Sequence, residues 1–222
     1  MNTKPVDSKK LTVFFDFDNT ITTYDVIDDM LIRFSKDDKW KMLEKKWRDG
    51  SIGSRECLRG QIKGIKITKK DLDGYLSDVE IDPYFKKTLE LLKSMGIKML
   101  VLSDNFDYIL KTILGNNGIN GVETHSNRLG FGKSGLVPRF PFTGSECSDC
   151  GNCKKAILLR EAKKGFKSAY IGDGRSDICA AEQADIVFAK DDLLAHFRSN
   201  NLDHIPFDNL EDVYSYFKEN LS

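Results

Sequence analysis

The sequence predicts an α/β fold: a doubly wound, mainly parallel, Rossmann-like sheet with an inserted helical cap. Two observations lead to this prediction. Short apolar runs alternate with helical patterns along most of the 222 residues, which is typical of a parallel sheet covered on both faces. One long stretch after the first apolar run shows helical periodicity and no convincing strand. The length suits one core domain with a smaller inserted one.

The first strand is predicted within Leu11–Thr20, after a polar tail at residues 1–10. Its run of Val and Phe ends in two aspartates, a pattern that indicates a buried strand. Asp82 and Pro83 predict a helix start, with Asp as the N-cap and Pro at the first helical position. The pattern then predicts, in order, helix Pro83–Met95, strand Ile97–Ser103, helix Phe106–Leu114, strand Gly121–His125, an irregular hairpin Ser126–Phe142, helix Lys154–Lys164, strand Lys167–Gly172, helix Ser176–Gln183, strand Asp185–Ala189 and helices Asp191–Ser199 and Asn209–Asn220.

The predicted core domain comprises residues 1–22 and 80–222, and residues 23–79 form the predicted cap. Glycines separate the short helices of this cap, and its lysine-rich faces are expected to be solvated. A cap inserted after the first strand suits a moving lid that excludes water from a reaction.

Composition and terminal sequence argue against several classes of protein. The 34 basic and 34 acidic residues cancel, so there is no basic footprint for nucleic acid. No stretch approaches 18 consecutive apolar residues, and residues 1–10 lack the apolar core of a signal peptide. Five cysteines, an odd number, favour a reducing compartment. We therefore expect a cytoplasmic protein with no nucleic-acid or membrane partner, and the sequence leaves its oligomeric state open.

Asp16 and Asp18 lie one residue apart at the end of the first predicted strand. On a strand their side chains point to the same face, at the carboxyl end where open α/β sheets place their ligands. Two carboxylates side by side repel each other in an apolar setting, so a cation is expected to join them. Mg²⁺ is the commonest hard cation with oxygen ligands. The alternative interpretation is an Asp18 that merely caps a turn.

Three further segments follow in a fixed order. Ser103 ends the second predicted strand, Lys154 opens a helix after a cysteine-rich loop, and Asp173 ends a third strand with Asp177 four residues later. Any one segment is weak evidence, but the ordered set is specific. Together with the Asp16 motif, the set resembles the haloacid dehalogenase (HAD) superfamily of phosphatases over nearly the whole chain.

The resemblance implies that Asp16 is a nucleophile that forms an aspartyl-phosphate, and that Asp18 serves as general acid and base. It also implies a Mg²⁺ site made by Asp16, Asp173 and the backbone carbonyl of Asp18. The cation would offset repulsion between the nucleophile and a phosphate dianion. Gly172 and Gly174 are expected to let the backbone turn tightly there. The implied activity is hydrolysis of a small phosphorylated metabolite.

The resemblance assigns the phosphate to Ser103, Asp104 and Lys154. Lys154 is preferred to its neighbour Lys155 because it immediately follows a cysteine, as in relatives, and a helix N-terminus also favours anions. Asp177 lies one helical turn beyond the metal site and would hold a metal-bound water or the lysine.

The helical cap and the segment Asn127–Leu129 resemble the phosphoserine-phosphatase branch of the superfamily. Two substrate positions depart from that branch: Asp25 stands in place of a Glu, and an ungapped reading puts Gln61 in place of an Arg. A substrate carboxylate without its Arg would be poorly held, which argues against phosphoserine. Arg55 or Arg59 would supply the missing group if the reading is shifted.

Two other branches fit better. The methionine-salvage phosphatases of 2-hydroxy-3-keto-5-methylthiopentenyl-1-phosphate share Asp25, the cysteine-rich loop before Lys154, and segments like Ala184–Ala189 and Ile205–Asp208. The phosphoethanolamine and phosphocholine phosphatases share the Ser-Asp pair at residue 103 and the cysteine before the lysine. The first is favoured. Asp25, Gln61, Asp104 and Asn105 are the expected hydrogen-bond partners of the leaving group.

Three interpretations stay open. Cys147, Cys150 and Cys153 have metal-ligand spacing, but zinc usually takes four ligands, so a reduced loop packed beside Lys154 is favoured. A phosphotransferase would share every motif. A non-enzymatic phospho-acceptor module would also use clustered aspartates and a lysine, although Asp18 and the cap favour an enzyme.

Overall fold

The structure, a computed structural model, describes residues 10–133, 135–142, 149–162 and 165–221. The chain forms two compact units. The first combines Met1–Thr23, Ile81–Leu102 and Lys154–Ser222, and the second combines Tyr24–Glu80 and Ser103–Cys153. The first stretch of the second unit overlaps the predicted cap, residues 23–79, and residues 103–153 also belong to this unit. The division into a core domain and a cap stays a prediction.

The first unit is built on parallel strands. They are β1 (Leu11–Phe15), β2 (Lys98–Phe106), β5 (Lys167–Gly172), β6 (Ile186–Ala189) and β7 (Ile205–Pro206). Their order is β2-β1-β5-β6-β7, within a full strand order of β4-β3-β2-β1-β5-β6-β7 in which β2 belongs to both units. Every residue of β1 is buried, as its apolar sequence requires for a central strand. Phe14 of β1 pairs with Leu100 of β2 and Tyr170 of β5.

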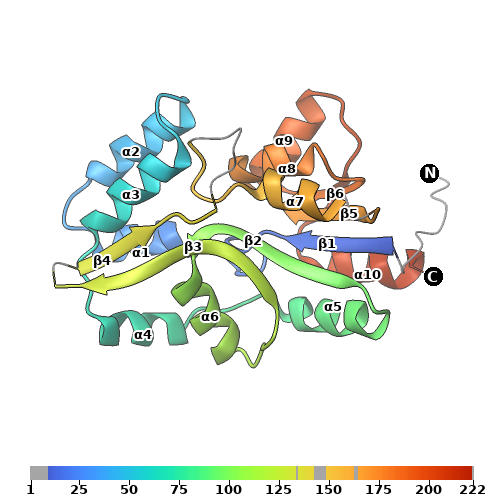
Figure 1. Ribbon diagram of the computed structural model, residues 1–222, viewed down its shortest axis with the longest axis horizontal. Helices are drawn as coiled ribbons and strands as arrows, with labels where there is room; N and C mark the ends of the chain where they lie inside the picture. Colours follow the sequence, from blue (N-terminus) through green and yellow to red (C-terminus); the bar gives the residue numbers. More distant parts are fainter. Residues whose placement is uncertain (1–9, 134, 143–148, 163–164, 222) are drawn as a thin grey trace. The chain divides into compact units, whose positions relative to one another are not determined.

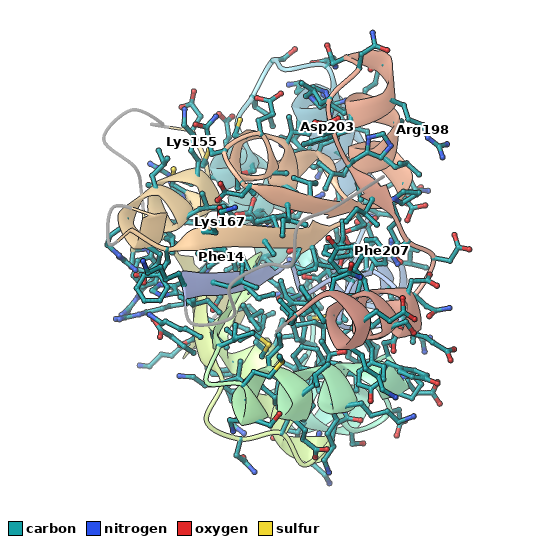
Figure 2. All side chains as sticks on the ribbon, turned by 90° about the vertical axis from the view of Figure 1, so that its right-hand side faces the viewer. Phe14, Lys155, Lys167, Arg198, Asp203 and Phe207 are labelled. Carbon is teal, nitrogen blue, oxygen red and sulfur yellow. The ribbon has the colours of Figure 1, made fainter. Side chains whose placement is uncertain are left out.

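Helices cover both faces of these strands, which confirms the predicted doubly wound α/β fold. Figure 1 shows α7, α8 and α9 on one side of the first unit and α5 and α10 on the other. Their bounds are α5 (Pro83–Ser94), α7 (Lys154–Ala162), α8 (Ile178–Ala181), α9 (Asp191–Ser199) and α10 (Leu210–Asn220). On the α7 side, Phe14, Leu100 and Tyr170 belong to a fully buried apolar cluster. Figure 2 shows Phe14 inside the unit and Arg198 and Asp203 at its periphery.

Several element boundaries differ from the predicted ones, and one predicted helix is replaced by two shorter elements. The helix predicted at Ser176–Gln183 is a short 3-10 turn, η2 (Arg175–Asp177), followed by α8. The predicted helix start at Asp82–Pro83 is confirmed: a carboxylate oxygen of Asp82 accepts the backbone N–H of Tyr84 at 2.8 Å. The second oxygen of Asp82 accepts the N–H of Leu210 at 2.9 Å, so the same carboxylate also caps α10.

The second unit combines helices with one antiparallel hairpin. The helices are α1 (Val26–Phe34), α2 (Lys39–Arg48), α3 (Ser54–Gly64), α4 (Lys69–Ser77) and α6 (Asp107–Asn116). The hairpin pairs β3 (Glu123–Gly132) with β4 (Gly135–Arg139). None of the residues of α2 is buried, in agreement with the solvated lysine-rich face that the sequence predicts. In the described part of the chain, no helix is long and apolar enough to cross a membrane.

Candidate active site

Asp16 lies at the carboxyl end of β1, and only 6% of its surface is exposed. Its N–H donates to the carbonyl oxygen of Ile171 on β5 at 2.8 Å, which extends the strand pairing by one residue. A turn follows, in which the carbonyl oxygen of Phe17 accepts the N–H groups of Ile21 and Thr22. Asp18 is half-buried in this turn. The turn thus reverses the chain immediately after the predicted nucleophile.

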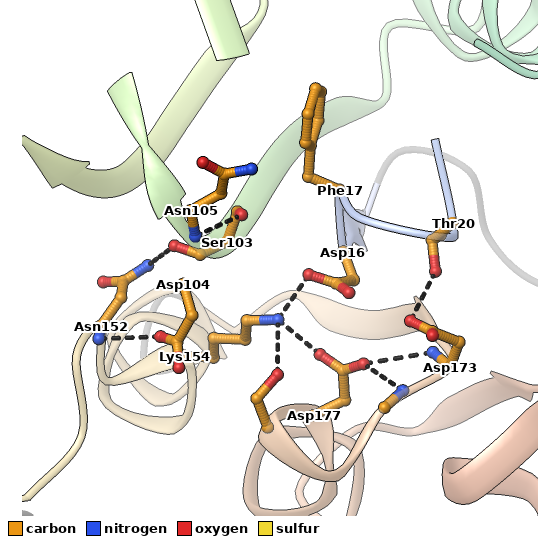
Figure 3. Close-up of polar contacts among 12 residues, drawn as sticks. Asp16, Phe17, Thr20, Ser103, Asp104, Asn105, Asn152, Lys154, Asp173 and Asp177 are labelled. Carbon is orange, nitrogen blue, oxygen red and sulfur yellow. Dashed lines mark hydrogen bonds and ion pairs between the residues drawn. The ribbon is translucent and has the colours of Figure 1, made fainter. Parts of the chain in front are cut away.

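Lys154 is the first residue of α7, and 3% of its surface is exposed. Its Nζ donates to Asp16 Oδ1 at 2.5 Å and to Asp177 Oδ1 at 2.6 Å, with Ser176 Oγ at 3.3 Å (Figure 3). Lys154 therefore contacts the predicted nucleophile, and its phosphate-binding role stays a prediction. One buried ammonium group bridges two buried carboxylates, which is a strongly coupled arrangement in a low-dielectric environment.

Asp177 is fully buried and accepts four hydrogen bonds. Its Oδ1 accepts from Lys154 Nζ and from the hydroxyl of Tyr170, each at 2.6 Å. Its Oδ2 accepts the N–H groups of Asp173 at 3.1 Å and Gly174 at 3.0 Å. Four donors satisfy a buried carboxylate and fix its orientation. Burial and the neighbouring Asp177 raise the pKa of Tyr170 well above its ordinary value, so its hydroxyl remains a donor.

Gly172 is required by the close approach of Asp177. A Cβ at Gly172 would lie 2.6 Å from Asp177 Oδ2 and 2.9 Å from a ring carbon of Tyr170. At Gly174 the nearest atom to a Cβ would be 3.9 Å away, an ordinary contact. The two glycines that the sequence treats alike therefore differ: one makes space for a carboxylate, and the other contributes a backbone N–H.

Asp173 follows β5 and is held by the turn after β1. Asn19 Nδ2 donates to Asp173 Oδ2 at 2.9 Å, and the hydroxyl of Thr20 donates to Asp173 Oδ1 at 3.2 Å. Asn19 Nδ2 also donates to Asp191 Oδ2 at 3.0 Å. Asn19 has a left-handed backbone, with φ of 52°, a conformation that asparagine tolerates better than most residues. The residues after the first motif thus position the aspartate of the last.

Asp16, Asp173 and Asp177 form a candidate metal centre. Each offers one carboxylate oxygen, and the three oxygens lie within 4.8 Å of one another. Burial first, and then the charge of Asp177, raise the pKa of Asp16 well above 3.8, although Lys154 acts in the opposite direction. The same two causes raise the pKa of Asp173. The single ammonium group of Lys154 does not balance the charge of three carboxylates. The remaining negative charge suits a hard divalent cation with oxygen ligands.

A second polar network surrounds Ser103 in the second unit (Figure 3). Ser103 is fully buried, and its Oγ accepts the N–H of Asn105 at 2.9 Å. Asn152 Nδ2 donates to the carbonyl oxygen of Ser103 at 3.0 Å, and the N–H of Asn152 donates to Asp104 Oδ1 at 2.9 Å. Asn127 Nδ2 donates to the carbonyl oxygen of Asp104 at 2.6 Å. Asp104 therefore holds the loop that precedes Lys154.

The predicted substrate residues have structural partners in the second unit. Asp25 is the N-cap of α1, and its Oδ1 accepts the N–H of Asp28 at 2.9 Å. Gln61 is only 2% exposed, and its Nε2 donates to Glu44 Oε2 at 3.2 Å. The backbone around Asn105 is tied locally, because its Oδ1 accepts the next N–H at 2.7 Å. Their roles toward a substrate stay predictions.

Two arginines of the second unit could replace the Arg that holds the substrate carboxylate in phosphoserine phosphatases. Both of them, Arg55 and Arg59, have partners in that unit. The guanidinium of Arg55 donates through Nε and Nη2 to the carbonyl oxygen of Cys150, at 3.2 and 3.1 Å. Arg59 lies over the ring of Phe140, 5.4 Å from its centroid. Arg55 thus fixes the cysteine-rich loop to α3.

The state of Cys150 agrees neither with a zinc site nor with a fully reduced loop, the two interpretations that the sequence allows. Cys147 lies outside the described residues. Cys150 is disulfide-bonded, whereas Cys153 is a free, buried thiol. A sulfur in a disulfide is not a thiolate, so in this structure Cys150 is neither a zinc ligand nor part of a reduced loop.

The sequence assigns no role to four residues that contact the three carboxylates or Lys154, namely Asn19, Thr20, Tyr170 and Ser176. A signal existed for the first two, which directly follow the Asp16 motif. Tyr170 lies between two apolar residues, Ala169 and Ile171, in a buried strand. A buried tyrosine hydroxyl usually has a hydrogen-bond partner, which is the signal that could have identified it.

Comparisons with known proteins identify the family of the chain. The family model described as "Putative Phosphatase" matches residues 11–203. The chain is 27% identical over 214 residues to the 2-hydroxy-3-keto-5-methylthiopentenyl-1-phosphate phosphatase of Geobacillus thermodenitrificans, covering 95% of this chain and 96% of that one. It is 28% identical over 216 residues to the bifunctional enzyme MtnB/MtnX of Bacillus licheniformis, covering 95% of this chain but spanning only 50% of that longer protein.

Solved structures show the same fold. A phospho-aspartyl intermediate analogue of phosphoserine phosphatase has a TM-score of 0.71 at 22% identity, covering 96% of this chain and 99% of that one. A substrate-bound phosphoserine phosphatase has a TM-score of 0.69 at 20% identity, with coverage of 97% and 99%. With the family model matching most of the chain, the protein belongs to the Putative Phosphatase family and is a phosphatase of the HAD type.

Proposed function

We propose that the protein is a Mg²⁺-dependent phosphomonoesterase that hydrolyses a small phosphorylated metabolite through an aspartyl-phosphate on Asp16. The observation that carries the proposal is the buried cluster in which Lys154 bridges Asp16 and Asp177 while Asp173 lies beside them. A lysine held on a carboxylate at a strand end suits phosphoryl transfer, which depends on positioning and on charge stabilisation.

The proposed reaction has two steps. In the first, Asp16 attacks phosphorus while Asp18 donates a proton to the leaving oxygen. In the second, Asp18 takes a proton from a water molecule whose oxygen attacks phosphorus, the bond between phosphorus and Asp16 breaks, and inorganic phosphate and the free Asp16 carboxylate result. Lys154 and Ser103 stabilise the phosphoryl oxygens throughout. Mg²⁺ held by Asp16, Asp173 and the carbonyl of Asp18 would supply further positive charge at these oxygens.

For the substrate, we propose 2-hydroxy-3-keto-5-methylthiopentenyl-1-phosphate or a close keto or hydroxylated phosphate. The names of the relatives support this choice, whereas the phosphoserine phosphatases share the fold at lower identity. The partners of Arg55 and Arg59 add support, because both groups are already engaged within the second unit. A phosphoserine carboxylate would have to displace one of them.

A phosphometabolite panel tests the proposal. It should contain the methionine-salvage substrate, sugar phosphates, phosphoethanolamine, phosphocholine and phosphoserine, assayed with Mg²⁺ and with chelator. We expect release of phosphate only with Mg²⁺, and a kcat/KM for the keto substrate at least about tenfold above that for phosphoserine, or about 1.4 kcal/mol. Phosphoserine as the best substrate would contradict the substrate choice. Full activity in chelator would contradict the metal site.

A leaving-group comparison tests the role of Asp18. Asp18→Asn should lose most turnover with an alkyl phosphate, because the alkoxide needs a proton. The loss should be smaller with p-nitrophenyl phosphate, whose leaving group needs little protonation. Equal losses with both substrates would argue against an acid role for Asp18, and appearance of a phosphorylated alcohol in the product mixture would indicate a phosphotransferase.

A further inference from the structure

Tyr170 occupies the middle of β5 and is completely buried. Its ring is part of the apolar cluster under α7 and α8, and it pairs in register with Phe14 and Val187. Its hydroxyl donates to Asp177 Oδ1 at 2.6 Å. The ring would be equally well buried as phenylalanine, so the hydroxyl serves this one polar contact and not the packing.

The oxygen that accepts from Tyr170 is the one that accepts from Lys154. Lys154 Nζ lies 2.6 Å from Asp177 Oδ1 and 2.5 Å from Asp16 Oδ1, so the two carboxylates compete for one ammonium group. A second donor on Asp177 Oδ1 partly neutralises that oxygen and weakens its attraction for Lys154. The backbone N–H groups on Oδ2 prevent the carboxylate from rotating away.

We infer that Tyr170 is a positioning residue that acts through Asp177 to keep Lys154 directed at Asp16 and the phosphoryl group. The catalytic consequence of this inference rests on the proposed function, whereas the contact between Tyr170 and Asp177 is independent of that function. Without the hydroxyl, Lys154 is the only side-chain donor to Asp177 Oδ1 among the described residues. The ammonium group then moves toward Asp177 and away from the position where phosphoryl charge develops.

The kinetic test uses Tyr170→Phe and the matched control Tyr84→Phe. The control removes a hydroxyl-to-carboxylate bond of the same length, 2.6 Å, between Tyr84 and Glu211 elsewhere in the first unit. With p-nitrophenyl phosphate, we expect Tyr170→Phe to lower kcat about tenfold while KM changes by less than about twofold, since the contact acts on the transition state. Tyr84→Phe should leave both constants unchanged. Equal kcat values for Tyr170→Phe and wild type would overturn the inference.

A double-mutant cycle separates positioning from a structural effect. If Tyr170 acts through Asp177, then Tyr170→Phe should change kcat by less than about twofold in an Asp177→Asn background. The same tenfold loss in both backgrounds would show that Tyr170 acts by another route and would overturn the inference.

The last readout does not depend on activity. In protein labelled with ¹⁵N-lysine, the buried ammonium signal of Lys154 is identified by its loss in Lys154→Arg. We expect this signal to shift in Tyr170→Phe and to stay in place in Tyr84→Phe. An unmoved signal in both variants overturns the inference. A wild type without phosphatase activity would refute the proposed function, and the ammonium signal would then decide the contact alone.

Discussion

Asp16 combines two properties that rarely coincide, because it is almost fully buried and it lies among other carboxylates. Burial and like charge both disfavour its ionised form, and Lys154 offsets them only in part. Such a residue is costly for the fold, and under the proposed function a bound cation would offset part of that cost. Perturbed groups of this kind concentrate at functional sites.

Asp16→Asn separates the two properties. The amide cannot attack phosphorus, so we expect kcat to fall by at least about a hundredfold. Because the variant removes one of three repelling carboxylates while Asp177 still pairs with Lys154, we expect its melting temperature in chelator to equal or exceed that of wild type. Kinetics and a thermal melt measure both effects. Turnover close to wild type would exclude Asp16 as the nucleophile.

The same carboxylates make the stability of the metal-free protein depend on pH. The pKa of Asp16 and that of Asp173 are raised in the folded protein above the value of 3.8 expected when unfolded. Between 3.8 and the raised values the folded state binds more protons, so these groups make the metal-free protein less stable as pH rises. Denaturation in chelator at several pH values should therefore show a weaker loss of stability with rising pH in Asp16→Asn than in wild type. Identical slopes would contradict the raised pKa of Asp16.

Gly172→Ala and Gly174→Ala form a matched pair. The first places a Cβ 2.6 Å from Asp177 Oδ2, so the carboxylate or the strand has to shift. We expect it to lower the free energy of unfolding by about 1–3 kcal/mol and to impair turnover. The second has no close neighbour and a φ of −107°, so it should stay near wild type. Urea denaturation compares them, and similar stabilities would show that the close approach is unimportant.

For the secondary-structure elements, the sequence predicts where a helix begins better than it predicts how far a helix or strand extends. The Asp82–Pro83 signal is local and specific, and the helix begins there. In place of the helix expected at Ser176–Gln183, the chain forms a 3-10 turn that ends at Asp177 and then the short helix α8. Asp177 is the residue of this turn that pairs with Lys154. The strand expected at Gly121–His125 and the first arm of the hairpin expected at Ser126–Phe142 form one continuous strand, β3, which runs from Glu123 to Gly132 and pairs with β4. Tertiary partners decide these cases.

Asp82 connects two elements that are far apart in sequence, since its two oxygens cap α5 and α10. Asp82→Ala leaves two helix N–H groups without acceptors, and we expect a loss of about 1–2 kcal/mol in the free energy of unfolding. Asp82→Asn keeps one acceptor oxygen and should lose about half as much. Thermal or urea denaturation of both variants measures this order. Equal losses for alanine and asparagine would argue that only one of the two caps matters.

The site illustrates what a sequence can and cannot predict. The sequence points to Asp16, Lys154 and Asp173 because each ends a strand or opens a helix, and to Asp177 by its spacing from Asp173. The structure brings all four together. The sequence predicts a substrate role for Gln61, and in the structure its side chain donates to Glu44 within the second unit. That partner is 17 residues away, and no periodicity encodes it.

For the whole molecule, charge balance predicts weak long-range steering. The 34 basic and 34 acidic residues cancel, so attraction of an anionic substrate depends on the local site. We expect kcat/KM to change by less than about threefold between about 0.02 and 0.2 M salt, because screening acts mainly on distant exposed charges. A steep fall in kcat/KM with salt would indicate a charged approach surface outside the cluster.

The path of the chain limits how the protein can be re-engineered. The polypeptide leaves one unit for the other after Thr23, Glu80, Leu102 and Cys153, so neither unit is encoded by a continuous stretch of its gene. A chimera that imports only residues 24–80 from a relative would separate Arg55 from Cys150, and Leu76 and Val79 from Asn116 and Asn117. A working exchange therefore needs two inserts. Two of the four recombination joints then fall immediately before Ser103 and Lys154, where a shift of a single residue would misplace a proposed phosphate ligand.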